Sequence, residues 1–168
     1  MDESLPVEQV RGWRARPGFT VVELVIVLMV AGILGTVTVA QISTYTSRRA
    51  ATDARDAFIA AAAQARAAAI RMGEDVEMRV DPVNDRVLVL RRRDGSTVIE
   101  PLDLNAGPLR GTILGREIIR ACYTSRGFML PSCGGTGNAT VGQAVDFRSP
   151  QGSHTATAVF TLAGARRP

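Results

Sequence analysis

The sequence predicts an α+β protein in which one long N-terminal helix packs on an antiparallel β-sheet domain. Three observations lead to this prediction: a run of 24 uncharged residues from Leu24 to Ser47, an alanine-rich stretch after it, and a two-residue alternation of apolar residues after Gly73. The chain has 168 residues, of which 46% are hydrophobic and 21% are charged, so it suits one folded domain and is not broadly disordered.

The uncharged run is long enough to cross a membrane. Its strongly apolar part, residues 24–42, approaches the roughly 20 residues that a helix needs to cross a hydrocarbon layer about 30 Å thick. A small domain rarely encloses a helix that is apolar on every face. A cleaved secretory signal is the alternative, with a shorter apolar core of about 7–15 residues and a weak cleavage site at Thr38-Val39-Ala40. We expect a membrane anchor.

The residues before this run carry a specific motif. An arginine-bearing leader ends at Gly18, Phe19 opens the apolar stretch, and Glu23 follows four residues later. This pattern resembles the class III signal of type IV pilins and type II secretion pseudopilins, in which Gly precedes Phe-Thr-Leu-x-Glu and an apolar run. The resemblance implies that a prepilin peptidase removes residues 1–18 after Gly18 and methylates the new amine of Phe19. Pro17 departs from the family, many of whose members carry a basic residue there.

Glu23 is the one charged residue where the apolar stretch begins. A carboxylate in hydrocarbon costs a few kcal/mol, less near a helix end, and is a functional residue by default. The resemblance implies that Glu23 neutralises the N-terminal amine of an adjacent subunit as the chain enters a growing filament. The alternative is a glutamate that snorkels to the membrane edge.

The resemblance divides the chain into a leader, a transmembrane and assembly helix at residues 19–47, and an exported domain at residues 48–168. Three arginines precede the span and two follow it: Arg11, Arg14, Arg16, Arg48 and Arg49. This margin favours a cytoplasmic N-terminus only weakly. The expected topology therefore rests on the motif. It is a single pass through the inner membrane with a periplasmic domain, and the chain is later expected in the pilus or pseudopilus.

The exported domain is expected to begin with a helix at residues 48–72. This stretch is rich in alanine, a strong helix former, and Gly73 is well placed to cap it. One face is apolar at spacings of three and four: Ala51, Ala54, Phe58, Ala61, Ala65, Ala68 and Met72. We expect this face to pack on the sheet.

An antiparallel sheet of about five to seven strands is expected within residues 75–165, because apolar and polar residues alternate there. The predicted strands are 76–80, 86–92, 97–99, 117–124, 143–148 and 155–162. Glycine-rich residues 132–142 are predicted to form a surface loop.

Two segments near the C-terminus are similar to motifs of the GspH/FimT group of minor pseudopilins and minor pilins. Residues 145–152 resemble the Phe-x-x-x-Gly strand and turn of that group, and residues 162–167 resemble its terminal glycine–arginine strand. The resemblance implies a structural subunit that meets other pilins or pseudopilins, the prepilin peptidase and an inner-membrane assembly platform. Whether the machine is a type II secretion system or a type IV pilus stays open.

The composition excludes several kinds of chemistry. All twenty basic residues are arginine, so a Walker A lysine and a Schiff base are excluded. His154, Cys122 and Cys133 are too few for a structural zinc site, and no serine lies in a G-x-S-x-G turn. We expect no enzyme activity, no cofactor and no metal.

Cys122 and Cys133 would lie in an oxidising compartment, where a disulfide between them is expected. A bridge across this loop would stabilise the domain by roughly 3 kcal/mol on the chain-entropy estimate. The alternative is a pair of unpaired buried thiols.

The basic C-terminus offers an alternative function. Some FimT-like minor pilins bind DNA through a terminal Gly-Arg-x-Arg pattern, whereas this chain reads Gly164-Ala165-Arg166-Arg167. The alternative is therefore a DNA-binding tip pilin with phosphate contacts at Arg166 and Arg167. The other interpretation is that these two arginines, and Arg91-Arg92-Arg93, are simply solvated surface residues that bind no DNA.

Overall fold

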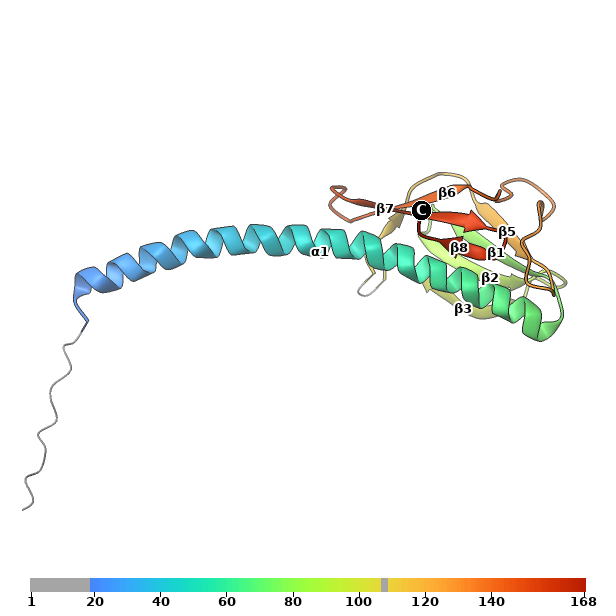
Figure 1. Ribbon diagram of the computed structural model, residues 1–168, viewed down its shortest axis with the longest axis horizontal. Coiled ribbons are helices and arrows are strands. Elements are labelled where there is room, and N and C mark those ends of the chain that lie inside the picture. The colour runs from blue at the N-terminus through green and yellow to red at the C-terminus, as the bar shows by residue number, and fades with distance from the viewer. Residues whose placement is uncertain (1–18, 107–108) are drawn as a thin grey trace, which may run out of the picture. The chain divides into compact units, whose positions relative to one another are not determined.

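The computed structural model describes residues 19–106 and 109–168 (Figure 1). The chain forms two compact units, Met1–Ala40 and Gln41–Pro168. Helix α1 (Val21–Met72) provides the described structure of the first unit apart from residues 19–20, and it also provides the only helix described in the second. The predicted leader, including Gly18, lies outside the described residues.

The two ends of α1 are set by local sequence. Thr20 caps the N-terminus, because its Oγ1 accepts a hydrogen bond of 3.2 Å from the backbone N–H of Glu23. Gly73 follows Met72 with a φ of +65°, the left-handed conformation in which helices commonly end and which costs glycine little. The predicted C-terminal cap is therefore confirmed.

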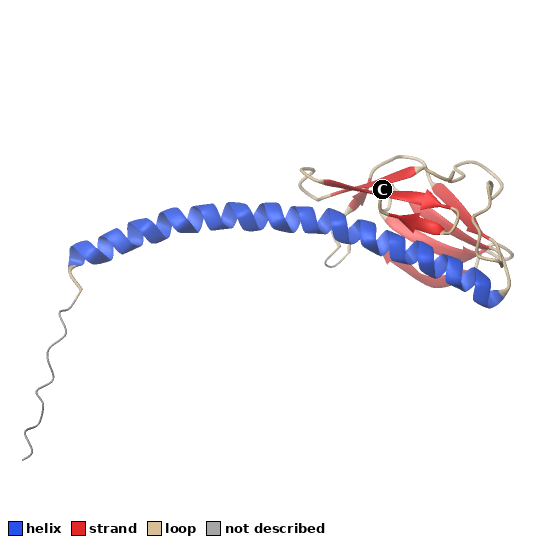
Figure 2. Cartoon of the chain, in the orientation of Figure 1, coloured by secondary structure: helices blue, strands red, loops and turns tan. Residues whose placement is uncertain are grey.

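In the second unit the strands form two antiparallel sheets (Figure 2). The first contains β1 (Val76–Asp81), β2 (Arg86–Arg91), β3 (Thr97–Asp103) and β5 (Ile119–Tyr123) in the order β3-β2-β1-β5. The second contains β4 (Thr112–Ile113), β6 (Ala144–Arg148), β7 (Thr155–Thr161) and β8 (Gly164–Arg166) in the order β4-β6-β7-β8.

The expected α+β architecture, a long N-terminal helix on antiparallel strands, is confirmed. The expectation of one sheet was wrong, because the strands divide into two sheets of four. The last strand was predicted to run to Leu162, but β7 ends at Thr161 and Leu162 is 59% exposed in the turn to β8. A two-residue or three-residue strand such as β4 or β8 is too short to show an alternation in the sequence.

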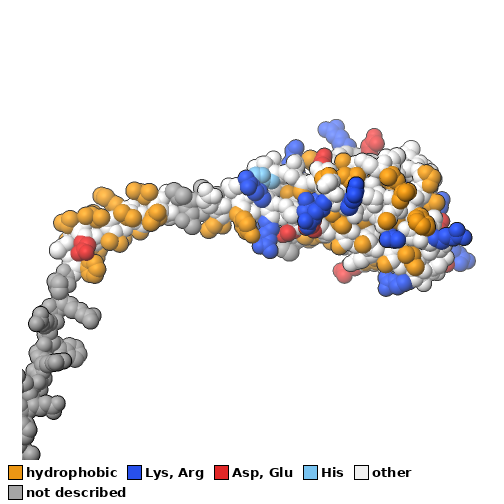
Figure 3. Space-filling model, viewed as in Figure 1, with side chains coloured by type: hydrophobic (Ala, Val, Ile, Leu, Met, Phe, Trp, Pro, Cys, Tyr) orange, Lys and Arg blue, Asp and Glu red, His pale blue; other side chains and the backbone are white. Residues whose placement is uncertain are grey.

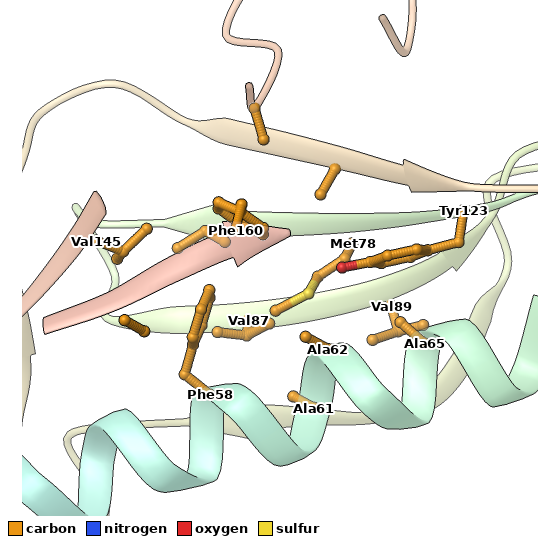
Figure 4. Close-up of a cluster of buried hydrophobic side chains, with 14 of the residues drawn as sticks. Phe58, Ala61, Ala62, Ala65, Met78, Val87, Val89, Tyr123, Val145 and Phe160 are labelled. Carbon is orange, nitrogen blue, oxygen red and sulfur yellow. The ribbon is translucent and has the colours of Figure 1, made fainter. Parts of the chain in front are cut away.

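The core lies between α1 and both sheets. The predicted helix face is buried from Ala51 to Ala68, and every second residue of β1 is buried as the alternation predicted. Phe58 reaches from the helix to the second sheet, with its ring centroid 5.2 Å from that of Phe147 and 5.6 Å from that of Phe160 (Figure 4). Close approach of the helix relies on small residues: a Cβ on Gly111 would collide with that of Ala54.

Asp85 joins the two sheets through a buried carboxylate. It precedes β2 with a φ of +51°, and its Oδ1 accepts a hydrogen bond of 2.8 Å from the backbone N–H of Ile113 in β4. Burial raises the pKa of Asp85, and the nearby charges of Asp103 and Asp81 add to this effect, while the hydrogen bond from Ile113 opposes it. Folding therefore makes this carboxyl group easier to protonate than it is in the unfolded chain.

Replacing Asp85 by asparagine is expected to stabilise the domain increasingly as pH rises. Because folding raises this pKa, the protonated Asp85 contributes its full stability to the fold below the unfolded pKa of about 3.9. That contribution to the free energy of unfolding is lost as pH rises through the folded pKa. Asparagine keeps an acceptor for Ile113 and does not ionise. Asp85→Ala leaves that buried N–H unpaired and should be about 1–3 kcal/mol less stable than Asp85→Asn. Denaturant unfolding of the full chain in detergent from pH 3 to 7 measures the free energy of unfolding of both variants and of the unaltered chain. A stability gain of Asp85→Asn over the unaltered chain that shrinks with rising pH would contradict the prediction.

Candidate assembly segment and charged surfaces

The first unit presents an apolar helical surface that nothing in the described structure covers. The large hydrophobic side chains from Val21 to Leu34 are all exposed, and even the least exposed of them, Val25, has an exposed fraction of 44%. By length and composition this part of α1 could cross a membrane. Figure 3 shows the same stretch covered by hydrophobic side chains. In water such a surface is unfavourable, so it requires lipid or other helices around it.

The two described residues of the predicted assembly motif lie at the start of this helix. Phe19 precedes the first turn and is 79% exposed, and Glu23 is exposed within that turn. Glu23 also has a local role in the helix, whatever the motif predicts for it. Its N–H donates a hydrogen bond to Thr20 Oγ1, and an acidic side chain in the first turn suits the helix dipole. The Thr-x-x-Glu spacing at residues 20–23 is a capping-box pattern that could have predicted this helix start from sequence.

Cys122 and Cys133 are joined in a disulfide, with their Cα atoms 5.5 Å apart. Both side chains are buried, and Cys122 belongs to β5. The loop that they close is also held by hydrogen bonds. Asn138 Oδ1 accepts one of 2.8 Å from the N–H of Cys133, and the carbonyl of Cys122 accepts one of 2.7 Å from the N–H of Leu130. The bridge thus fastens the end of this loop to the core sheet.

Tyr123, beside the disulfide, is fully buried. Burial raises the pKa of its phenol to about 12, although the charge of Arg66 opposes the shift. Its side chain lies next to Met78 in the core (Figure 4), and its hydroxyl has no hydrogen-bond partner among the described residues. The phenol therefore stays neutral at physiological pH and serves as packing.

The two C-terminal arginines have different environments. Arg167 Nη2 lies 2.6 Å from Asp56 Oδ2 on α1, and Asp56 also pairs with Arg55 at 2.9 Å. Burial alone would raise the pKa of Asp56, but the hydrogen bonds and charges of Arg55 and Arg167 hold it below its ordinary value. Arg166 is exposed at the end of β8. One of the two predicted DNA-contacting guanidinium groups is therefore already engaged by a carboxylate.

The arginine run at residues 91–93, which begins with the last residue of β2, is also paired with acidic residues. Arg91 lies 3.3 Å from Glu74, Arg92 lies 3.3 Å from Asp75, and Arg93 lies 4.0 Å from Glu74. These carboxylates come from the turn between α1 and β1. The run forms a local ion-pair network at the surface, in agreement with the view of it as solvated surface.

A hairpin turn at residues 149–154, between β6 and β7, contacts α1. Ser47 Oγ donates a hydrogen bond to Gln151 Oε1, and Arg48 Nε donates a longer one of 3.4 Å to His154 Nε2. Ser47 is 4% exposed whereas Gln151 is exposed, so this contact is partly buried. His154 lies at the end of this hairpin turn and is partly buried.

Within residues 19–106 and 109–168, no group of three or more histidine, cysteine, aspartate or glutamate side chains is placed to hold a metal ion. The described residues thus provide an apolar helix surface with one carboxylate, a disulfide-fastened loop and several arginine clusters.

No family model and no curated protein matches this sequence. Among solved structures, the chain is similar to the type IV minor pilin FimU of Pseudomonas aeruginosa, with 13% sequence identity. The match covers 74% of this chain and 92% of that one, with a TM-score of 0.49.

Proposed function

We propose that this chain is a minor pseudopilin or minor pilin of the GspH/FimT type. It is a structural subunit that is anchored in the inner membrane and assembled through its N-terminal helix. The proposal rests on one observation, the change in surroundings along the single helix α1. Its first part is apolar on all sides and exposed, while residues further along the same helix form the core of a folded domain. A helix of this kind can pass from lipid into a bundle of similar helices and keep its domain intact.

The start of the helix supplies the chemistry of assembly. After cleavage at Gly18, the methylated amine of Phe19 would carry a positive charge at the end of an apolar helix. The Glu23 carboxylate of a neighbouring subunit can neutralise this amine, and in low-dielectric surroundings such a pair is favoured over either charge alone. The partners are therefore other pilins or pseudopilins, the prepilin peptidase and an inner-membrane assembly platform.

Processing of the leader tests the proposal. The full chain is produced in membranes with and without a prepilin peptidase, and the mass of the purified protein is measured. The expected product lacks residues 1–18 and carries one extra methyl group on Phe19, whereas the sample without peptidase keeps its full length. Gly18→Leu is the control and should remain uncut, because a large side chain keeps the backbone away from the peptidase. Cleavage after Ala40 would instead show a secretory signal.

A further inference from the structure

Four arginines gather at one end of the second unit, around the hairpin turn 149–154. We call this cluster the basic end; it consists of Arg48, Arg49, Arg110 and Arg148, and all four side chains are exposed. Figure 3 shows arginine side chains beside the only histidine of the chain, which belongs to this turn. Arg110 and Arg148 lie far from Arg48 and Arg49 in the sequence, so only the fold brings them to one end.

The hairpin turn fixes the geometry of the basic end. Ser47 and Gln151 are hydrogen-bonded, and Gln151 Nε2 lies 3.5 Å from Ser43 Oγ one turn earlier on α1. Arg110 shares with Ser47 and Gln151 the lining of a cavity of about 240 Å³. Arg110 therefore lies at the same cavity as the helix and the turn.

Arg148 is placed at the same end by sheet pairing. It lies opposite Thr112 in the register of β4 and β6, and Thr112 Oγ1 donates a hydrogen bond of 3.2 Å to its carbonyl. Arg110 is two residues before Thr112 in the chain. The two arginines thus come to the basic end from adjoining segments.

The basic end has an excess of positive charge that the protein does not neutralise. Across the described ranges no carboxylate forms an ion pair with Arg48, Arg110 or Arg148, and Arg49 pairs only with Asp53, at 3.6 Å and exposed. The arginines at residues 91–93 and Arg167, in contrast, each form an ion pair with a carboxylate. Unpaired guanidinium groups are well suited to phosphate, which they can bind through two parallel hydrogen bonds.

The spacing of Arg48 from the end of the apolar run along α1 favours lipid as the source of the phosphate. Ile42 ends the strongly apolar stretch, and Arg48 follows six residues later, about 9 Å along a helix. The headgroup layer on each side of a bilayer is about 5–8 Å thick. A residue about 9 Å beyond the apolar stretch, such as Arg48, therefore lies where that layer meets water.

We propose that the basic end binds the phosphate groups of anionic phospholipids in the bilayer that the chain itself crosses. This contact docks the domain on the membrane surface before the subunit enters a filament. The proposal rests on the membrane anchoring stated under the proposed function. Nucleic acid phosphate is the competing ligand, and the experiment distinguishes the two.

Hydrogen exchange in nanodiscs tests the docking. The full chain is reconstituted in discs of phosphatidylcholine alone and in discs that also contain phosphatidylglycerol, and amide exchange is measured over residues 149–154. Exchange is expected to slow at least about threefold with phosphatidylglycerol, and the difference should vanish at high salt. Arg110→Gln/Arg148→Gln should remove it. The matched control, Arg93→Gln/Arg126→Gln, changes the net charge equally on exposed residues outside the basic end and should retain it.

Each outcome has a defined meaning. Incorporation into both kinds of disc with equal exchange at residues 149–154 would overturn the docking and leave the membrane anchor standing. Failure to incorporate into either disc would overturn both proposals. Slower exchange caused by duplex DNA in phosphatidylcholine discs, with no effect of phosphatidylglycerol, would show that the basic end binds nucleic acid. Loss of the effect in both double variants would mean that general charge and not this site attracts the lipid.

Discussion

Glu23→Ala is expected to leave the chain anchored in the membrane but to prevent its incorporation into filaments. The substitution removes the carboxylate without shortening the apolar run, so insertion should be unchanged or slightly improved. The neighbouring subunit's Phe19 amine would then enter a low-dielectric helix bundle without a partner, which is strongly unfavourable. Filaments purified from cells that produce the variant should contain almost none of it, whereas its amount in the membrane fraction should match that of the unaltered chain.

Two control variants separate the charge of Glu23 from its place in the first helical turn. Glu23→Gln keeps the size and the helical position but removes the charge, and should fail like the alanine variant. Thr20→Ala removes the hydroxyl that accepts the Glu23 N–H at a cost of about 1 kcal/mol in helix stability, and should still assemble. Normal incorporation of Glu23→Ala would refute the assembly role, and failure of Thr20→Ala alone would assign the effect to the cap.

Phe58→Ala is expected to lower the free energy of unfolding of the second unit by about 3–5 kcal/mol. The ring is fully buried and contacts both Phe147 and Phe160, so its loss opens a cavity where α1 meets the second sheet. The neighbouring helix residues are mostly alanine and cannot fill the space. Guanidinium unfolding of the full chain in detergent micelles measures the change.

Phe128→Ala is the matched control, because it makes the same chemical change at a side chain that is 57% exposed. The hydrogen bond at this position, from the N–H of Phe128 to Thr124 Oγ1, involves the backbone and survives the substitution. Its expected cost is below about 1 kcal/mol. Similar losses in the two variants would show that Phe58 is not a central core residue.

Structural features that depend on residues close together in the chain could be predicted from the sequence. The apolar run, the cap at Gly73 and the stripe through Ala54, Phe58 and Ala65 follow from helical periodicity, and the alternation in Val76, Met78 and Val80 follows from strand geometry. The motif around Phe19 and Glu23 is equally local. Each of these features depends on residues within a few positions of one another, so the sequence by itself determined them.

Features that join distant parts of the chain were decided only by the tertiary structure. Asp85 accepts a hydrogen bond from Ile113 across two sheets, and Arg167 pairs with Asp56, which lies 111 residues earlier. The division of the strands into two sheets belongs to the same class, because no residue pattern shows which strand a short segment such as β4 joins.

The basic end shows the difference most clearly. The sequence shows Arg48, Arg110 and Arg148 as three separate charges, one after an apolar run and two beside turns. Their gathering depends on the contact of Gln151 with Ser47 and on the pairing of β4 with β6. The sequence thus determined that this chain has a helix long and apolar enough to cross a membrane, followed by a folded region of helix and strands. The surface that the domain presents was decided by the fold, because charge clusters form from long-range contacts that leave no periodic signal.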